Sequence, residues 1–158
     1  MYTYTLISTT EFKIENVTKN FSMNYIGDET LAISETDKFN LRELNENKVT
    51  KLKQNAASAQ AKIDTAFVSF PKFEIDTFAS QQRDYVKYQD AIANNIDPLT
   101  LTYEFATDLL IVGETLASLM TRIGGNMTYV KGVQKVMRQT SFDIKACTTQ
   151  AELDAIVF

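Results

Sequence analysis

The side chains that most often carry out catalysis are scarce in this chain, which has no histidine and one cysteine among its 158 residues. Without histidine, Ser-His-Asp and Cys-His nucleophile systems and histidine-containing zinc sites are excluded. Cys147 would need another activator, and its place on a predicted apolar helix face indicates a buried structural thiol. None of the five glycines forms a phosphate-binding loop or a dinucleotide fingerprint. The composition therefore argues against the common classes of nucleophilic, zinc and nucleotide-binding enzymes.

Acidic residues are the remaining candidates for chemistry. The pairs close enough in sequence to hold a cation, or to act as acid and base, are Glu74 with Asp76, Asp84 with Asp90, and Asp28 with Glu29. None of these pairs belongs to a calcium-binding loop, and solubilising surface charge is the alternative explanation for each. We therefore predict a protein that is not an enzyme, with no catalytic residue, no metal, no cofactor and no small-molecule substrate.

Residues 1–39 have the alternating pattern of short β-strands. Apolar and polar side chains alternate around Tyr4, Phe12, Met23 and Ile33, and short polar or glycine-bearing links separate these runs. Three or four antiparallel strands are expected, and a sheet of this size can bury only one face. The other face must stay in water, cover a partner or lie under the helix that follows.

An apolar seam is the central pattern of the chain. Its residues follow one another at steps of three and four, the spacing of one helical face. They are Val49, Leu52, Ala56, Ala59, Ile63, Ala66 and Phe70. The alanines permit close approach of another helix, within the chain or in another copy. The seam is the predicted interface, in a helix over residues 40–70 that Asp37 or Asn40 would cap and Pro71 would end.

After this helix the sequence predicts one extended stretch and further helices. The extended stretch covers residues 72–78, and the helices cover residues 80–94, 103–123, 126–147 and 150–157. Gly124 and Gly125 predict a helix end, and Thr149 with Glu152 matches a capping box. In an alternative interpretation, Leu99, Leu101 and Tyr103 form a strand before the helix that would start near Tyr103.

The predicted fold class is therefore α+β. A small N-terminal antiparallel β-sheet over residues 1–39, a docking module, is followed by a mainly helical bundle or helical hairpin array over residues 40–158.

The distribution of charge limits the kinds of partner. The formal net charge of −4 argues against a nucleic-acid-binding protein. Residues 40–70 are the most basic part, with five bases and three acids, which fits either a solvated helix face or a site for an acidic partner. No apolar run is long enough to span a membrane, and the first residues lack the features of a signal peptide. We therefore expect a soluble chain with no membrane partner.

The two ends of segment 73–156 resemble a domain of unknown function found in tail and tail-fibre proteins of tailed bacteriophages and prophages. The matching residues are Phe73-Glu74-Ile75-Asp76-Thr77-Phe78, Ser80-Gln81-Gln82-Arg83 and the run from Asp143 to Ile156. In that family an extended stretch leads into a Ser-Gln-Gln-Arg-like helix start, and the chain closes on a helix, a threonine break and a Glu-Leu-x-x-Ile ending. This chain lacks the tryptophan that the family commonly has in between. Residues 26–48 are also similar to the entry module of phage tail-fibre assembly proteins.

The resemblance implies a virion structural protein of the tail, tail fibre or baseplate that is assembled in the host cytoplasm. Such a protein would act through contacts with copies of itself and with other phage tail proteins, and the family supplies no catalytic residues. Two other functions fit the sequence. One is a tail-fibre assembly chaperone that leaves before the particle is complete, and the other is a small acidic phage inhibitor of a host protein.

Overall fold

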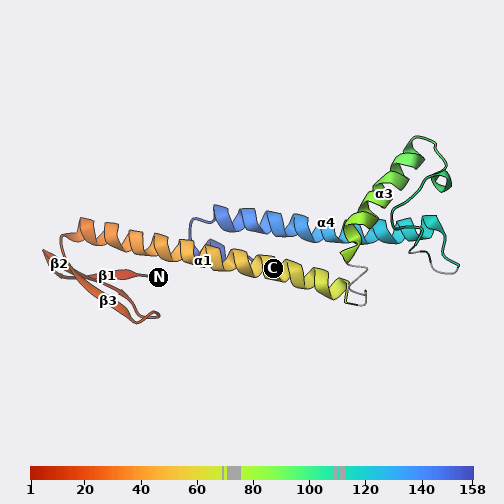
Figure 1. Cartoon of the computed structure of the whole chain (residues 1–158). Coiled ribbons are helices and arrows are strands. Elements are labelled where there is room, and N and C mark those ends of the chain that lie inside the picture. Colours follow the sequence, from red (N-terminus) through yellow and green to blue (C-terminus); the bar gives the residue numbers. More distant parts are fainter. Residues whose placement is uncertain (69, 71–75, 109, 111–112) are drawn as a thin grey trace. The chain divides into compact units, whose positions relative to one another are not determined.

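In the computed structural model, residues 1–68, 70, 76–108, 110 and 113–158 are described. The strands are β1 (Thr3–Ser8), β2 (Glu11–Asn16) and β3 (Phe21–Ile26), and the helices are α1 (Glu29–Ala66), α3 (Phe78–Ala93), the 3-10 turn η1 (Pro98–Thr100), α4 (Leu116–Ala146) and α5 (Gln150–Asp154) (Figure 1). The predicted α+β class, with a small antiparallel sheet followed by mainly helical segments, is confirmed. Within the described ranges, no helix has the length and apolar character needed to cross a membrane.

The described chain divides into two compact units. Unit 1 contains Met1–Asn55 and Thr140–Phe158, and unit 2 contains Ala56–Gln139. These limits fall within α1 and α4, whereas the sequence pattern places a boundary between residues 39 and 40. Both chain termini therefore belong to unit 1.

The sheet of unit 1 is an antiparallel meander in the order β1-β2-β3. Tyr4 is opposite Ile14, and Ile14 is opposite Met23, so these side chains share one face. That face packs on the start of α1, where Phe12 and Ile14 are fully buried with Ala32. The opposite face carries the charged side chains of β2. The sheet thus buries one face, as expected for its size.

α1 begins well before the predicted start at residue 40. Asp28 caps it, because its Oδ1 accepts a hydrogen bond from the Leu31 N–H at 3.0 Å. The expected caps, Asp37 and Asn40, lie inside the helix. Leu31 and Ile33 are therefore helical, although the alternating pattern placed them in a possible fourth strand. The sheet has three strands.

α4 is one helix where two were predicted. Residues 103–108 and 113–115 are not helical, and α4 runs from Leu116 to Ala146 through both Gly124 and Gly125. The prediction of a helix end at these glycines is wrong for a physical reason. A Cβ on Gly124 would lie 2.6 Å from Cε2 of Tyr85, so this glycine permits close packing of α3 on α4.

Three other predictions concern the second half of the chain. The extended stretch over 72–78 lies largely outside the described residues, and α3 already begins at Phe78. The alternative strand at Leu99–Tyr103 is not formed, because η1 occupies Pro98–Thr100. The capping box at Thr149 and Glu152 is confirmed, although α5 ends at Asp154 rather than at residue 157.

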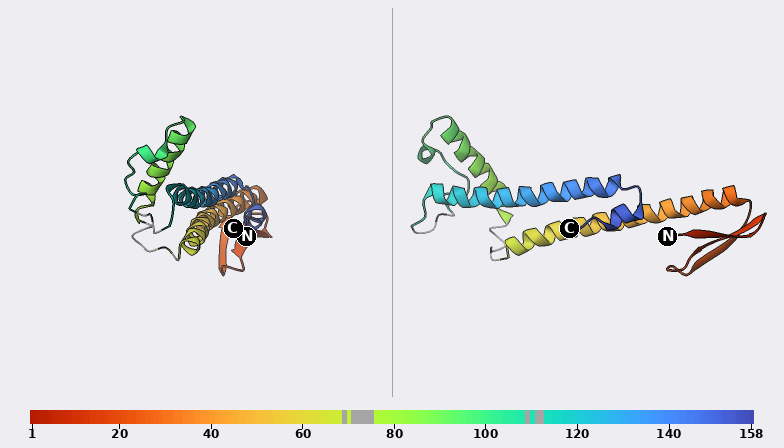
Figure 2. Two further views of the ribbon diagram at one scale, coloured as in Figure 1. Left: turned by 90° about the vertical axis from the view of Figure 1, so that its right-hand side faces the viewer. Right: turned by 180° about the vertical axis from the view of Figure 1, so that it is seen from behind.

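The core of unit 2 is where α3 and the loop after η1 pack on the first half of α4 (Figure 2). The buried residues are Tyr103, Ala106, Leu116, Leu119, Met120 and Ile123. Tyr85 and Tyr88 of α3 pack against this cluster. The loop therefore supplies buried side chains to the core although it is not helical.

Candidate assembly surface

The buried stripe of α1 overlaps the predicted seam only in part. Among the seam residues, Ala59 is buried, Leu52, Ile63 and Phe70 are half-buried, and Val49, Ala56 and Ala66 are exposed. Asn55 and Phe67 are buried instead, each one position from an exposed alanine. The inward face of α1 is thus rotated from the predicted seam.

Asn55 explains this difference. It is only 4% exposed, and its Nδ2 donates a hydrogen bond to Oγ of Ser141 at 2.9 Å within unit 1. A buried amide that has a hydrogen-bond partner is compatible with a core position. A pattern of apolar residues does not include it. Nothing in the sequence of α1 reveals Ser141 as its partner.

Exposed apolar residues remain on the outer side of α1 in unit 1. Leu41 is 59% exposed and Val49 is 53% exposed, and Asn45 lies midway between them at steps of four. An open depression on this face is lined by Lys38, Leu41, Arg42, Asn45, Glu46 and Val49, which together we call the assembly surface. Arg42 and Glu46 form an ion pair across it, with 3.1 Å between Nε and Oε1. The surface therefore combines apolar groups with both signs of charge.

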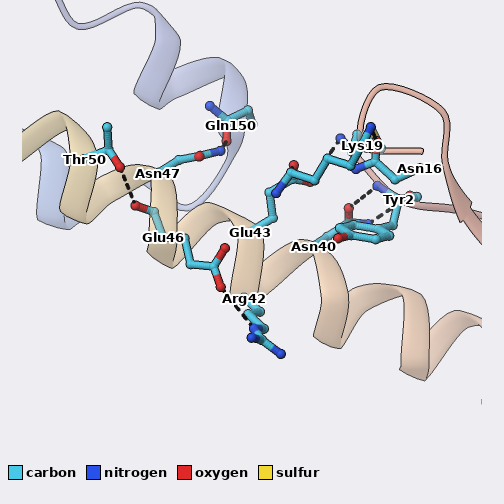
Figure 3. A network of polar contacts seen from close by, with 11 residues as sticks. Tyr2, Asn16, Lys19, Asn40, Arg42, Glu43, Glu46, Asn47, Thr50 and Gln150 are labelled. Carbon is cyan, nitrogen blue, oxygen red and sulfur yellow. Dashed lines mark hydrogen bonds and ion pairs between the residues drawn. The ribbon is translucent and has the colours of Figure 1, made fainter. Parts of the chain in front are cut away.

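The N-terminus is tied to the helix that carries this surface (Figure 3). The Tyr2 N–H donates to Oδ1 of Asn40 at 2.7 Å, and Nδ2 of Asn40 donates to the Tyr2 carbonyl at 3.2 Å. The Glu43 carboxylate pairs with the Met1 amine at 3.1 Å and with Nζ of Lys19 at 3.0 Å. Burial alone would raise the pKa of Glu43, but the hydrogen bonds from Lys19 and the amine outweigh it and hold this pKa below its ordinary value.

The C-terminal segment holds the same part of α1. Nδ2 of Asn47 donates to Oε1 of Gln150 at 2.9 Å, and Nζ of Lys48 donates to the Lys145 carbonyl at 3.2 Å (Figure 3 shows the first). Cys147 is buried near them, and its Sγ donates to a helix carbonyl. The predicted burial of this thiol is confirmed.

Of the three acidic pairs, the two that lie wholly within the described residues do not bring their carboxylates to a common site. Asp84 is buried whereas Asp90 is exposed, and Asp28 caps α1. Glu29 accepts a hydrogen bond from the Tyr4 hydroxyl at 3.1 Å, and Glu74 lies outside the described residues. In the part of the chain that the structure describes, no group of three or more cysteine or acidic side chains is placed to hold a metal ion.

Asp84 has a structural role that the sequence did not indicate. Its carboxylate accepts hydrogen bonds from the backbone N–H groups of Glu104, Phe105 and Ala106 at 2.9, 2.8 and 2.9 Å. These bonds attach the loop after η1 to α3 and satisfy a buried charge. The loop can therefore enter the core of unit 2 without forming a helix of its own.

The polar groups and the exposed apolar groups of this region differ in their contacts within the chain. The polar groups with clear partners tie elements of the chain to each other, whereas the exposed Leu41 and Val49 of α1 line an open depression. Comparison of the chain with protein-family models, with curated proteins and with solved structures gives no match.

Proposed function

We propose that the protein is a structural component of a bacteriophage tail, tail fibre or baseplate. It acts through contacts with copies of itself and with neighbouring tail proteins. The resemblance of residues 73–78, 80–83 and 143–156 to a tail-associated domain supports the phage assignment. The exposure of Leu41 and Val49 on the assembly surface is the observation that carries the role in protein contacts.

The assembly surface is complementary to itself. In a two-fold contact the same patch meets its own copy, so that residue i faces j and j faces i. Two antiparallel helices centred on Asn45 would place Leu41 of one copy opposite Val49 of the other. Asn45 would then meet its counterpart, and a central asparagine pair is a known way to fix the register of two helices. Arg42 of each copy would lie near Glu46 of the other, which adds charge complementarity.

Light scattering of the purified protein over a concentration series tests this contact. We expect a dimer or larger oligomer for the natural chain. Val49→Asp should move the midpoint of association to at least about tenfold higher concentration, because a charge would be placed opposite Leu41 of the other copy within the contact. A natural chain that stays a 17.9 kDa monomer at every concentration would contradict self-association.

Matched variants separate association from folding. Gln54→Asp introduces the same charge at an exposed position on the opposite side of α1, and it should associate like the natural chain. Leu52→Asp is unsuitable for this test, because Leu52 packs against the cluster of Leu44 and Ile144 and its loss would affect folding. Unchanged far-UV circular dichroism for Val49→Asp would show that the helix is intact.

The phage assignment has its own test. Mass spectrometry of purified particles from a phage that encodes this chain should detect it at a fixed ratio to the major tail protein. Its absence from complete particles, together with its presence on unassembled fibres, would contradict a virion component and identify an assembly chaperone.

A further inference from the structure

α4 is strongly basic although the whole chain has a net charge of −4. Its basic residues are Arg122, Lys131, Lys135, Arg138 and Lys145, and its one acidic residue is Asp143. Lys131, Lys135 and Arg138 belong to unit 2 and are exposed, and their steps of four and three place them on one side of the helix. Within the described residues, none of these three takes part in an ion pair or hydrogen bond. Their positive charge is therefore not paired within the part of the chain that the structure describes.

A groove of about 330 Å³ lies beside this basic face in unit 2. Phe78 of α3 and Met127 and Val130 of α4 line it, and all three are only half-buried, so the groove exposes apolar surface. Lys131 also lines the groove, together with the amide side chain of Gln134. The apolar lining and the basic face are therefore continuous at Lys131.

We propose that this groove and the basic face bind an acidic amphipathic segment of another protein. The apolar side chains of the segment occupy the groove, and its carboxylates face Lys131, Lys135 and Arg138. Apolar anchors in a groove with complementary charges along its edge are a recurrent mode of peptide recognition. The inference rests on the proposed function, because it states what kind of neighbour the protein contacts.

Two other anionic partners fit the observations less well. A nucleic acid is bound mainly through phosphates, and three cations on a chain of net charge −4 offer few such contacts, while a phosphate backbone has no apolar group for the groove. Adsorption on an anionic membrane would require a free apolar face on α4. Leu119, Met120 and Ile123 of α4 are instead buried in the core of unit 2, and Tyr129 and Val136 are the only large apolar side chains exposed in the described unit 2 part of this helix.

The test is a binding titration of the full chain with a synthetic probe. The probe is a fluorescein-labelled peptide with leucines at helical spacing and glutamates at the other positions, and binding is followed by fluorescence anisotropy. We expect saturable binding that weakens as salt is added. Lys135→Glu should reduce the affinity about fivefold or more. Val130→Thr, which is nearly isosteric, should also reduce the affinity, because it places a hydroxyl in the apolar groove.

Lys53→Glu is the matched control. It makes the same charge reversal at an exposed lysine of α1 in unit 1, and it should change the affinity by less than about twofold. Equal losses for Lys53→Glu and Lys135→Glu would show a general effect of net charge and overturn the proposal. Tighter binding of a single-stranded oligonucleotide or of phosphatidylglycerol vesicles than of the peptide would also overturn it.

Light scattering without the peptide keeps this inference separate from self-association. A chain that self-associates but does not bind the acidic peptide would contradict the groove site and leave the proposed function standing. A monomeric chain that binds the peptide with the expected pattern of variants would support the groove site and contradict self-association.

Discussion

At the scale of the residue, Asp84 gives a specific prediction about stability. Its buried carboxylate accepts three backbone N–H groups from the loop after η1. Asp84→Asn removes the charge and turns an amide NH₂ towards groups that are themselves donors. We expect the free energy of unfolding, measured by urea denaturation, to fall by about 2 kcal/mol.

Asp90 provides the control for this prediction. It lies in the same helix but is exposed, so Asp90→Asn should change the free energy of unfolding by less than about 0.5 kcal/mol. Similar stabilities for the two variants would mean that the Asp84 hydrogen bonds are of little importance in solution.

Glu152 gives a prediction about pH. Its Oε2 accepts the Thr148 N–H at 2.6 Å and the Thr149 N–H at 3.2 Å, and these bonds lower the pKa of Glu152 below the ordinary value of 4.5. Because the pKa is lower in the folded chain, the stabilisation is complete above the unfolded-state pKa and is lost as the pH falls through the folded-state pKa. We expect α5 to loosen in this acidic range.

An NMR titration checks this pH dependence. The carboxyl group of Glu152 should titrate below pH 4.5, and Glu152→Gln should remove this step from the chemical shifts of α5. Thr149→Ala removes the other half of the capping box and should destabilise α5 by about 1 kcal/mol at neutral pH while the Glu152 titration remains. A Glu152 pKa at or above its ordinary value would contradict the capping role of its carboxylate.

At the scale of the element, the glycines of α4 should respond differently to the same substitution. Gly124→Ala would place a Cβ 2.6 Å from the Tyr85 ring, so α3 or the ring must move, at a cost of about 1–3 kcal/mol. Gly132→Ala meets nothing within 4 Å and should stabilise the helix by up to about 1 kcal/mol.

Thermal unfolding compares the stabilities of these two variants directly. The melting temperature should fall for Gly124→Ala and rise for Gly132→Ala. A rise for both would show that helix propensity outweighs the packing of Tyr85 on α4, and that close packing of α3 does not require a glycine at position 124.

At the scale of the whole molecule, the two compact units predict how the chain can be shortened. Asn55 and Ser141 are hydrogen-bonded at 2.9 Å in unit 1, so the two chain segments of this unit end close together. Unit 1 also has its own buried clusters around Phe12 and Leu44. We expect residues 1–55, joined to residues 140–158 by a turn of about four residues, to fold independently.

Circular dichroism and two-dimensional NMR would test the shortened chain. Dispersed amide resonances and a cooperative thermal transition are expected, and Ile144→Asp in the same chain should abolish both, because Ile144 is fully buried. A disordered shortened chain with the natural Ile144 would show that unit 1 depends on residues 56–139 for its stability.

Local features of the sequence were enough to predict part of the fold. The alternation around Tyr4, Phe12 and Met23 predicted the strands. Every second side chain of a strand lies on the same face of the sheet, and this does not depend on what packs against that face. Thr149 and Glu152 predicted the start of α5, since a capping box is formed by residues three apart. The apolar surroundings of Cys147 predicted its burial.

The basic side of α4 was visible in the sequence. The predicted helix over residues 126–147 already contains Lys131, Lys135, Arg138 and Lys145, with Asp143 as its one acidic residue. The structure adds that Lys131, Lys135 and Arg138 are exposed and that an apolar groove lies beside Lys131.

The sequence by itself therefore determined the class of fold, the strands and the cap of α5, all of which depend on residues close together in the chain. The tertiary structure alone decided which side of α1 is buried, whether α4 continues and where the loop after η1 lies. Each of these depends on a pair distant in sequence: Asn55 with Ser141, Gly124 with Tyr85, and Asp84 with the N–H groups of residues 104–106. A polar or glycine residue has no apolar periodicity, so its place in a core appears only when its partner is found.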